Sequence, residues 1–245
     1  MKNVKYIVIE GIDGSGKETQ TNLLYSYLVS KNKKVEKQSF PNYKSESSNP
    51  VKMYLNGELS KNANEIDAYQ SSVLFATDRF CTMKKIYNNI ENNSFVIFDR
   101  YVSSNMIHQG GKINNKNDLD NFLNWLNDFE FNILKIPKPD KIIFLNVTPE
   151  ISINLMKKRN ELKSGTKNDI QENDINHLVN AYNTGIYIAK KFNWDIINCF
   201  DDNGNLKNVQ EIQDEISEKI LRSELKDGQN VKIDFENDEL KFEII

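Results

Sequence analysis

The chain has 245 residues, of which 38% are hydrophobic and 27% are charged, and its formal net charge is −3. This composition is typical of a globular protein with one α/β domain, and the slight acidic excess argues against a dedicated nucleic-acid-binding protein. Cys81 and Cys199 lie far apart without metal-ligand spacing, which indicates reduced thiols in a cytoplasmic protein. Because no apolar run has the length needed to span a bilayer, we expect no membrane partner.

The first predicted element is a β-strand at residues 6–9, which a glycine-rich loop and a helix at residues 18–31 follow. The loop has two glycines and a lysine at the spacing of a phosphate-binding P-loop. Glycines let successive backbone N–H groups converge on an oxyanion, and the lysine reaches the β- and γ-phosphates of a nucleotide. The predicted ATP-binding residues are Gly11, Asp13, Gly14, Ser15, Gly16, Lys17, Glu18 and Thr19.

One position of this loop departs from the usual pattern. Glu18 stands where a serine or threonine normally holds Mg²⁺. Either phosphate oxygens and water hold the metal, or a carboxylate contributes, which makes Glu18 a candidate metal ligand. The phosphate cradle does not depend on this side chain, so the prediction of nucleotide binding stands.

Short β-branched runs alternate with amphipathic stretches along the rest of the chain, which predicts a parallel sheet with helices on its faces. Further strands are expected at residues 35–40, 95–98, 142–147 and 196–199, for five strands in all. Further helices are expected at residues 63–89, 119–131, 150–159, 174–192 and 209–221. Thr148 followed by Pro149 is a typical helix start. We therefore predict a three-layer α/β/α fold of the P-loop NTPase type.

Two segments do not follow this alternation. Residues 160–173 are polar and lie between two predicted helices, so they form either a solvated linker or a short lid. Residues 231–235 and 239–245 alternate as in a β-hairpin. We expect one P-loop domain at residues 1–222 and a C-terminal tail at residues 223–245.

Asp99 and Arg100 follow the predicted strand at residues 95–98. In open α/β sheets, ligands bind beyond the carboxyl ends of the strands. A carboxylate there can orient Mg²⁺ directly or through water, and an arginine can bind a phosphate with two hydrogen bonds. A surface ion pair is the alternative, but the position after a strand of a P-loop protein favours a functional role.

Five ordered segments make the chain similar to the thymidylate kinases, a branch of the nucleoside monophosphate kinases. They are EGIDGSGKETQ at residues 10–20, SFPNY at 39–43, LFATDR at 74–79, DRYVSSN at 99–105 and LKIPKPD at 134–140. The resemblance implies transfer of the γ-phosphoryl group of MgATP to dTMP, which gives dTDP and ADP for dTTP biosynthesis. It also implies a homodimer.

The resemblance further implies roles for individual residues. Phe75 corresponds to the aromatic residue that stacks on thymine, and Arg79 to the residue that reaches the base or the acceptor phosphate. Arg100 corresponds to the clamp on the acceptor phosphate. The substrate-binding candidates are Asp13, Phe40, Pro41, Tyr43, Phe75, Arg79, Arg100, Ser104, Asn105 and His108.

The sequence departs from the family at two further points. His108 stands where the family often has a tyrosine or phenylalanine that packs on the sugar and rejects a ribose 2′-hydroxyl. The P-loop contains no arginine, so the chain resembles members in which the lid supplies a cation, and Arg159 is the only arginine there. The catalytic candidates are thus Lys17, Arg100 and Arg159. The other histidine, His177, is expected on an exposed helix surface.

Two other functions compete with the thymidylate kinase hypothesis. The chain could be a deoxynucleoside kinase or a monophosphate kinase with another base preference. It could also be a nucleotide-binding regulator without turnover, which Glu18 and the single lid arginine would suggest. Lys17, Asp99 and Arg100 occurring together argue against the regulator.

Overall fold

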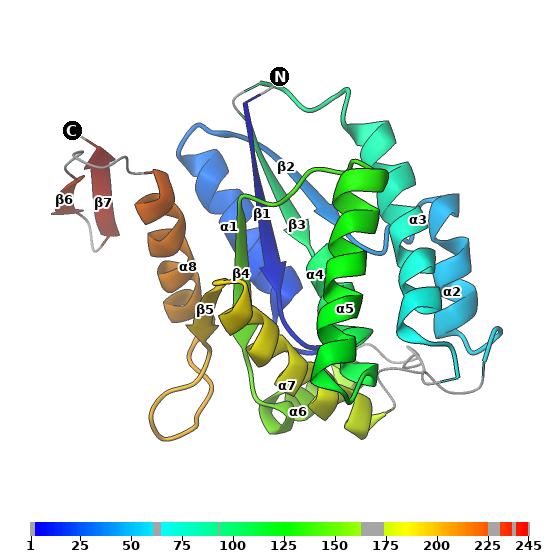
Figure 1. The fold of residues 1–245 in the computed structure, drawn as a ribbon. Coiled ribbons are helices and arrows are strands. Elements are labelled where there is room, and N and C mark those ends of the chain that lie inside the picture. The colour runs from blue at the N-terminus through cyan, green and yellow to red at the C-terminus, as the bar shows by residue number, and fades with distance from the viewer. Residues whose placement is uncertain are drawn as a thin grey trace.

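The computed structural model describes residues 3–60, 65–92, 94–162, 174–224, 231–236 and 239–244. Five strands form one parallel sheet in the order β2-β3-β1-β4-β5 (Figure 1). They are β1 (Val4–Glu10), β2 (Lys34–Ser39), β3 (Ser94–Asp99), β4 (Lys141–Asn146) and β5 (Asp195–Asn198). The predicted five-stranded parallel sheet is confirmed, with strand ends within one or two residues of the expected positions.

Helices cover both faces of the sheet, as the alternating sequence predicts. On one face lie α1 (Lys17–Ser30) and α8 (Val209–Glu224), and on the other lie α3 (Ala68–Ile86), α4 (Val102–His108), α5 (Lys116–Asn127) and α7 (Ile175–Lys191). Successive residues of β1 point to opposite faces, so Ile7 packs toward α1 whereas Tyr6 and Val8 pack toward α3–α5. The inner strands β1, β3 and β4 are therefore buried on both sides over most of their length, which explains their apolar sequences. The edge strand β2 is instead largely exposed and mostly polar.

The strand register places three strand ends together. Asp99 at the end of β3 pairs with Ser39 of β2 on one side and with Ile9 of β1 on the other. Glu10 follows Ile9 and pairs with Phe144 of β4. Because all strands are parallel, the loops that follow β1, β2 and β3 leave the sheet at one edge.

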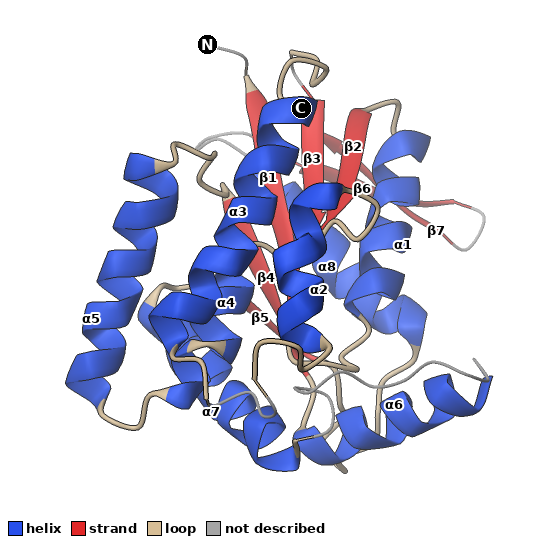
Figure 2. Ribbon diagram, turned by 90° about the vertical axis from the view of Figure 1, so that its right-hand side faces the viewer, coloured by secondary structure: helices blue, strands red, loops and turns tan. Residues whose placement is uncertain are grey.

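Two short helices were not expected from the sequence, α2 (Asn49–Leu55) and α4. Each has seven residues, too short for a clear helical period, and each is set by packing. Tyr54 of α2 packs edge-to-face on Phe75 of α3, with ring centroids 6.1 Å apart. The two helices lie side by side (Figure 2).

Capping residues explain where the longer helices begin. α3 begins at Ala68 because the Asp67 carboxylate accepts a hydrogen bond from the Gln70 N–H at 2.8 Å. Residue 63, where this helix was expected to begin, lies outside the described residues, but residues 65–67 are described and precede the helix, so the predicted start is too early. The helix also ends at Ile86, three residues before its expected end. α6 (Pro149–Leu162) begins as predicted, after Thr148. α5 ends earlier than expected, and a π-helical turn (Asp128–Ile133) follows it.

The tail forms the predicted hairpin, in which β6 (Val231–Glu236) pairs antiparallel with β7 (Glu239–Ile244). Most of the predicted lid falls on residues 163–173, which lie outside the described residues. Among the residues that the structure describes, no helix combines the length and the apolar character needed to cross a bilayer.

Candidate active site

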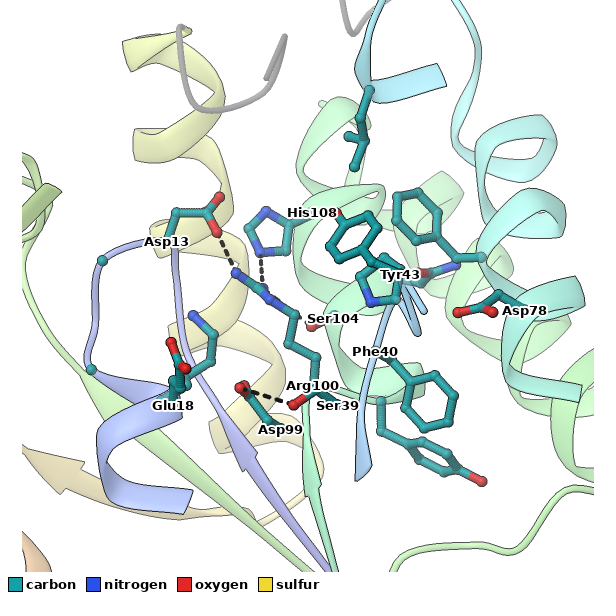
Figure 3. Close-up of a pocket in the computed structure, with 18 of the residues that line it drawn as sticks. Asp13, Glu18, Ser39, Phe40, Tyr43, Asp78, Asp99, Arg100, Ser104 and His108 are labelled. Atoms are coloured by element: carbon teal, nitrogen blue, oxygen red, sulfur yellow. Dashed lines mark hydrogen bonds and ion pairs between the residues drawn. The ribbon is translucent and has the colours of Figure 1, made fainter. Parts of the chain in front are cut away.

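A cavity of about 680 Å³ opens where the loops after β1, β2 and β3 leave the sheet (Figure 3). The predicted site residues that line it are Asp13, Gly14, Gly16, Lys17, Glu18, Thr19, Phe40, Pro41, Tyr43, Phe75, Arg79, Asp99, Arg100, Ser104, Asn105, His108 and Arg159. Gly11 and Ser15 are instead buried within the P-loop. The lining residues that sequence reasoning missed are Ser39, Leu55, Asp78, Tyr101, Gln109, Leu155 and Met156.

The P-loop needs its glycines for both conformation and space. Gly14 and Gly16 have φ values of 73° and 83°, in the left-handed region that side chains other than glycine rarely adopt. A Cβ on Gly14 would also lie 2.8 Å from the backbone oxygen of Ser152. Ser152 belongs to the first turn of α6, and its hydroxyl donates to the backbone oxygen of Asp13. The loop is thus held against α6.

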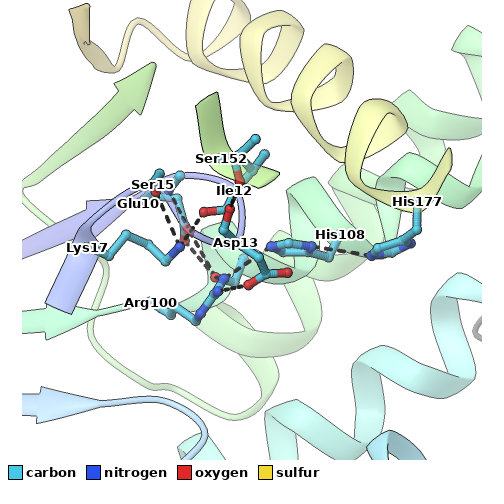
Figure 4. A network of polar contacts seen from close by, with 11 residues as sticks. Glu10, Ile12, Asp13, Ser15, Lys17, Arg100, His108, Ser152 and His177 are labelled. Atoms are coloured by element: carbon cyan, nitrogen blue, oxygen red, sulfur yellow. Dashed lines mark hydrogen bonds and ion pairs between the residues drawn. The ribbon is translucent and has the colours of Figure 1, made fainter. Parts of the chain in front are cut away.

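The side chain of Lys17 is buried, with 6% of the residue exposed, and it points back toward the P-loop (Figure 4). Its Nζ donates to the backbone oxygen of Ile12 at 2.6 Å and to Ser15 Oγ at 3.4 Å. Burial and the charge of Arg100 together lower the pKa of Lys17 to about 8, although nearby Asp13 opposes the shift. A desolvated ammonium bound mainly to neutral oxygens is well suited to receive an anionic ligand.

Arg100 joins the end of β3 to the P-loop. Its backbone is in the left-handed region, with φ 67°, and its guanidinium forms an ion pair with Asp13. The NH1 group lies 3.1 Å from His108 Nε2 and 3.4 Å from Ser104 Oγ. Burial alone would raise the pKa of Asp13, but the charge of Arg100 outweighs it and holds this pKa well below its usual range. Both partners are therefore charged at neutral pH.

Glu10 is a further site residue that sequence reasoning did not single out. Its fully buried carboxylate accepts hydrogen bonds from the Gly11 N–H at 3.0 Å, from Ser103 Oγ at 2.7 Å and from Ser104 Oγ at 2.9 Å. It thereby ties the start of the P-loop to the first turn of α4. An acidic residue at the end of an apolar strand is the sequence signal that could have indicated it.

Arg79 lies in the wall of the cavity, and its guanidinium is held in an ion pair with Glu130. It is 2% exposed, and its Nε donates to Glu130 at 2.8 Å while NH2 completes a two-pronged ion pair. Its NH1 lies 3.4 Å from Asn105 Oδ1 and from the backbone oxygen of Tyr101. Glu130 belongs to the π-helical turn (Asp128–Ile133) and is fully buried, so this pair fixes the guanidinium beside Asn105.

Aromatic side chains form the wall beside Arg79. Phe75 is half-buried and Tyr43 is 52% exposed, so both present ring surface to the cavity. Phe40 is buried against the stacked rings of Phe98 and Tyr101 and precedes Pro41 in a cis peptide bond. Figure 3 shows Tyr43 and Phe40 on the side of the cavity opposite Asp13.

Asp78 fixes the loop that carries Tyr43. The carboxylate of Asp78 accepts hydrogen bonds from the Asn42 N–H at 2.7 Å and from Ser47 Oγ at 2.6 Å. Asp78 is 1% exposed and belongs to the middle of α3. An acidic residue on the buried face of a helix is the signal that the sequence offered.

Two carboxylates could contribute to a metal site. Asp99 and Glu18 both line the cavity, and Asp99 is held by a 3.5 Å hydrogen bond from Ser39 Oγ. In the part of the chain that the structure describes, no three or more metal-ligating side chains cluster together. Mg²⁺ usually takes one or two carboxylates and completes its shell with phosphates and water. The donor set therefore fits Mg²⁺ bound together with a nucleotide.

His177 is not on an exposed surface, so the prediction for this residue was wrong. It is 4% exposed, and its Nε2 lies 3.4 Å from His108 Nδ1. The reason is that α7 packs along α4, which turns the first turn of α7 toward the interior.

Arg159 is an exposed residue of α6 at the rim of the cavity. The helix continues to Leu162, three residues beyond its predicted end. The lid lysines Lys163 and Lys167 lie outside the described residues.

Comparisons with known proteins identify relatives. The thymidylate kinase family model matches residues 9–198. The chain is 33% identical to the thymidylate kinase of Schizosaccharomyces pombe over 148 residues (60% of this chain, 63% of the relative). It is 32% identical to that of Plasmodium falciparum over 154 residues (62% and 66%). It is 31% identical to a probable thymidylate kinase of Methanococcus aeolicus over 223 residues (89% and 96%).

The chain thus covers just under two thirds of the first two relatives, at 63% and 66%, and 96% of the third. A solved structure of thymidylate kinase from Candida albicans is similar over 99% of both chains, with a TM-score of 0.66 and 19% identity. At this identity the likeness establishes the fold, which is the predicted P-loop type.

The two buried histidines predict a dependence of stability on pH. Burial lowers the pKa of His108 well below its usual value and also lowers that of His177. Below about pH 6.5, the unfolded chain therefore binds more protons than the folded one. The free energy of unfolding has its full value above that pH and should fall as the pH is lowered, by at most about 1.4 kcal/mol per pH unit for each ring that stays neutral in the folded state.

Urea titrations at a series of pH values measure this dependence. His177→Gln should remove part of the loss, because His108 is then the only histidine left in the chain. A free energy of unfolding that stays level across this range in the unmodified protein would contradict the neutral, buried state of both rings.

Proposed function

This chain belongs to the thymidylate kinase family, and we propose that it transfers the γ-phosphoryl group of ATP to dTMP, giving dTDP and ADP. One observation carries this proposal. A single cavity joins the P-loop and Lys17 on one side to Phe75 and Arg79 on the other, with Arg100 between them. A donor nucleotide and an acceptor nucleotide could therefore meet end to end beside Arg100.

On the donor side, the backbone N–H groups of the P-loop and the start of α1 bind the β- and γ-phosphates. Lys17 leaves its contact with the Ile12 carbonyl for the phosphate oxygens, where its charge stabilises the transferring group. The catalytic power comes from positioning and from these fixed charges, because phosphoryl transfer needs little covalent chemistry from the protein.

On the acceptor side, Phe75 stacks on the thymine, and Arg79 and Asn105 read the base edge. Arg100 binds the acceptor phosphate, because its guanidinium has five N–H donors and Asp13 and His108 occupy only part of them. Pro41, Tyr43 and Ser104 complete this side, and His108 packs beside the sugar. Asp13 serves the acceptor by holding Arg100.

Mg²⁺ is part of the proposal. Asp99 and Glu18 would hold it, directly or through water, together with the phosphate oxygens of ATP. When bound, the ion neutralises negative charge that develops on the phosphates. Glu18 can take this role because its exposed carboxylate lines the cavity beside Lys17, where other P-loops carry a hydroxyl.

The family match favours this function over the other candidates. A deoxynucleoside kinase would accept thymidine itself, and Arg100 would then lack its phosphate partner. A nucleotide-binding regulator without turnover would need the P-loop but no acceptor site, whereas Phe75, Arg79 and Arg100 line the same cavity as the P-loop.

A coupled assay of ADP release tests the function. The substrates are dTMP, dUMP, the ribose counterpart of dTMP, and thymidine, each with MgATP, and we expect dTMP to have the highest kcat/KM.

Lys17→Met should lower kcat by about 100-fold or more, because it removes a positive charge that stabilises the transferring phosphate. The fold should persist, since the Ile12 carbonyl still accepts the Ser15 N–H at 3.2 Å. Near-normal turnover by the folded variant would refute the proposal.

Phe75→Ala should weaken dTMP binding by about 1–3 kcal/mol, the usual effect of losing a base-stacking ring, and leave the KM for ATP unchanged. Because Phe75 also packs on Tyr54, Phe75→Leu serves as a second variant that retains apolar packing without a ring face. Lys84→Ala, at an exposed position in the last turn of the same helix, is the control. Lower stability of Phe75→Ala with an unchanged KM for dTMP would assign this residue to the core alone.

Arg159 is proposed as the cation that approaches the transferring group in place of a P-loop arginine. Arg159→Ala should lower kcat by about 10- to 1,000-fold, and Arg159→Lys should recover only part of it. Lys158→Ala, an exposed neighbour on α6, is the control. If Arg159→Ala is fully active but Lys163→Ala or Lys167→Ala is not, the donor is a lysine. A role in capping the helix dipole alone would lower only stability.

We also propose a cytoplasmic homodimer. Both cysteines are free thiols, which agrees with a reducing compartment. Met53 of α2 and Tyr69 and Val73 of α3 are exposed apolar side chains on adjacent helices, which agrees with pairing through helices that flank the sheet. Light scattering measures the mass of the purified protein in solution. We expect the mass of a dimer, and the mass of a monomer would contradict the proposed homodimer.

A further inference from the structure

The only two histidines of the chain meet at the inner side of the candidate site (Figure 4). His108 belongs to the last turn of α4 and His177 to the first turn of α7, 69 residues apart in sequence. Their rings are nearly parallel, at 20°, with centroids 5.6 Å apart, and they are 5% and 4% exposed. His108 Nδ1 faces His177 Nε2 at 3.4 Å.

The contact with Arg100 determines which nitrogen of His108 carries a proton. Arg100 NH1 lies 3.1 Å from His108 Nε2, and a guanidinium can only donate hydrogen bonds. Nε2 must therefore accept, which places the single proton of a neutral His108 on Nδ1. That N–H points to His177 Nε2, which in turn must accept.

The charges around the two rings favour this neutral arrangement. Burial lowers the pKa of His108 well below its usual value, and the charges of Arg100 and Lys17 act in the same direction, whereas the carboxylate of Asp13 opposes them. Around His177 lie Asp13, Lys112 and Asp174, and burial again lowers the pKa. A proton on Nε2 of His108 would point directly at the Arg100 guanidinium and break their hydrogen bond.

We infer that His177 is a positioning residue for the acceptor phosphate: by accepting the Nδ1–H of His108, it keeps His108 Nε2 able to hold the guanidinium of Arg100. The role of Arg100 toward the phosphate rests on the proposed function, whereas the hydrogen-bond order does not. The guanidinium of Arg100 is held by its contacts with Asp13, Ser104 and His108, so a change at His108 alters its position.

The hydrogen-bond order is measured directly by long-range ¹H–¹⁵N correlation spectra of the full chain labelled at histidine. Only two rings give signals, and His177→Gln assigns them. We expect His108 to be neutral with its proton on Nδ1 at about pH 7.5. A proton on Nε2 of His108, or a charged His108 ring, would overturn the inference whatever reaction the protein catalyses.

The effect on the acceptor is measured with two variants of His177. His177→Phe keeps a ring but cannot accept, so the KM and Kd for dTMP should rise by about 2- to 10-fold, the usual effect of one lost hydrogen bond. The KM for ATP should stay unchanged. His177→Gln can accept with its amide oxygen and should recover most of the affinity. Val179→Ala, an exposed residue of the same helix, is the control.

The outcomes separate this inference from the proposed function. If His177→Phe and His177→Gln lower stability alike and leave dTMP affinity unchanged, the histidine pair is structural and the inference is wrong. If the unmodified protein neither binds nor phosphorylates dTMP, the proposed function fails, and the spectra still decide the hydrogen-bond order. Loss of dTMP affinity in His177→Phe with rescue in His177→Gln supports both.

Discussion

The ion pair between Asp13 and Arg100 connects the two halves of the candidate site. Asp13 belongs to the P-loop and Arg100 to the end of β3, and the register of the sheet brings these two strand ends side by side. Several other polar contacts at this edge surround the pair. Glu10 ties the P-loop to α4, Ser104 and His108 from α4 contact Arg100, and Ser152 holds the backbone of Asp13. The phosphate cradle and the acceptor wall are therefore one connected structure.

This arrangement sacrifices stability for function. Lys17, Arg79, Glu10 and Glu130 are almost completely buried, and a charge removed from water is stabilised only by partners of good geometry. Arg79 and Glu130 satisfy each other, whereas Lys17 rests on a carbonyl and a hydroxyl. Lys17 therefore has the poorest partners of the four, and a bound phosphate would give it the anionic partner that it lacks. This agrees with its place in the P-loop.

The strands and the P-loop could be predicted from the sequence because both depend on local signals. A parallel strand that is buried on both faces is a continuous apolar run, and the glycine spacing reflects the backbone conformation that Gly14 and Gly16 adopt. The residues that escaped prediction are set by tertiary contacts. Glu130 meets Arg79 across 51 residues, and His177 is buried only because α7 lies on α4. No local pattern carries such information.

The π-helical turn (Asp128–Ile133) has a consequence for how the chain tolerates insertions and deletions. Removing one residue before Glu130 would let α5 continue as a regular helix and rotate this side chain by about 100° around the axis. Arg79 would then remain in the interior as an uncompensated charge. Ile133, which is 63% exposed, can be exchanged freely, but the length of the turn cannot change. In this turn, the number of residues, which sets the helical register of Glu130, matters more than the identity of most of them.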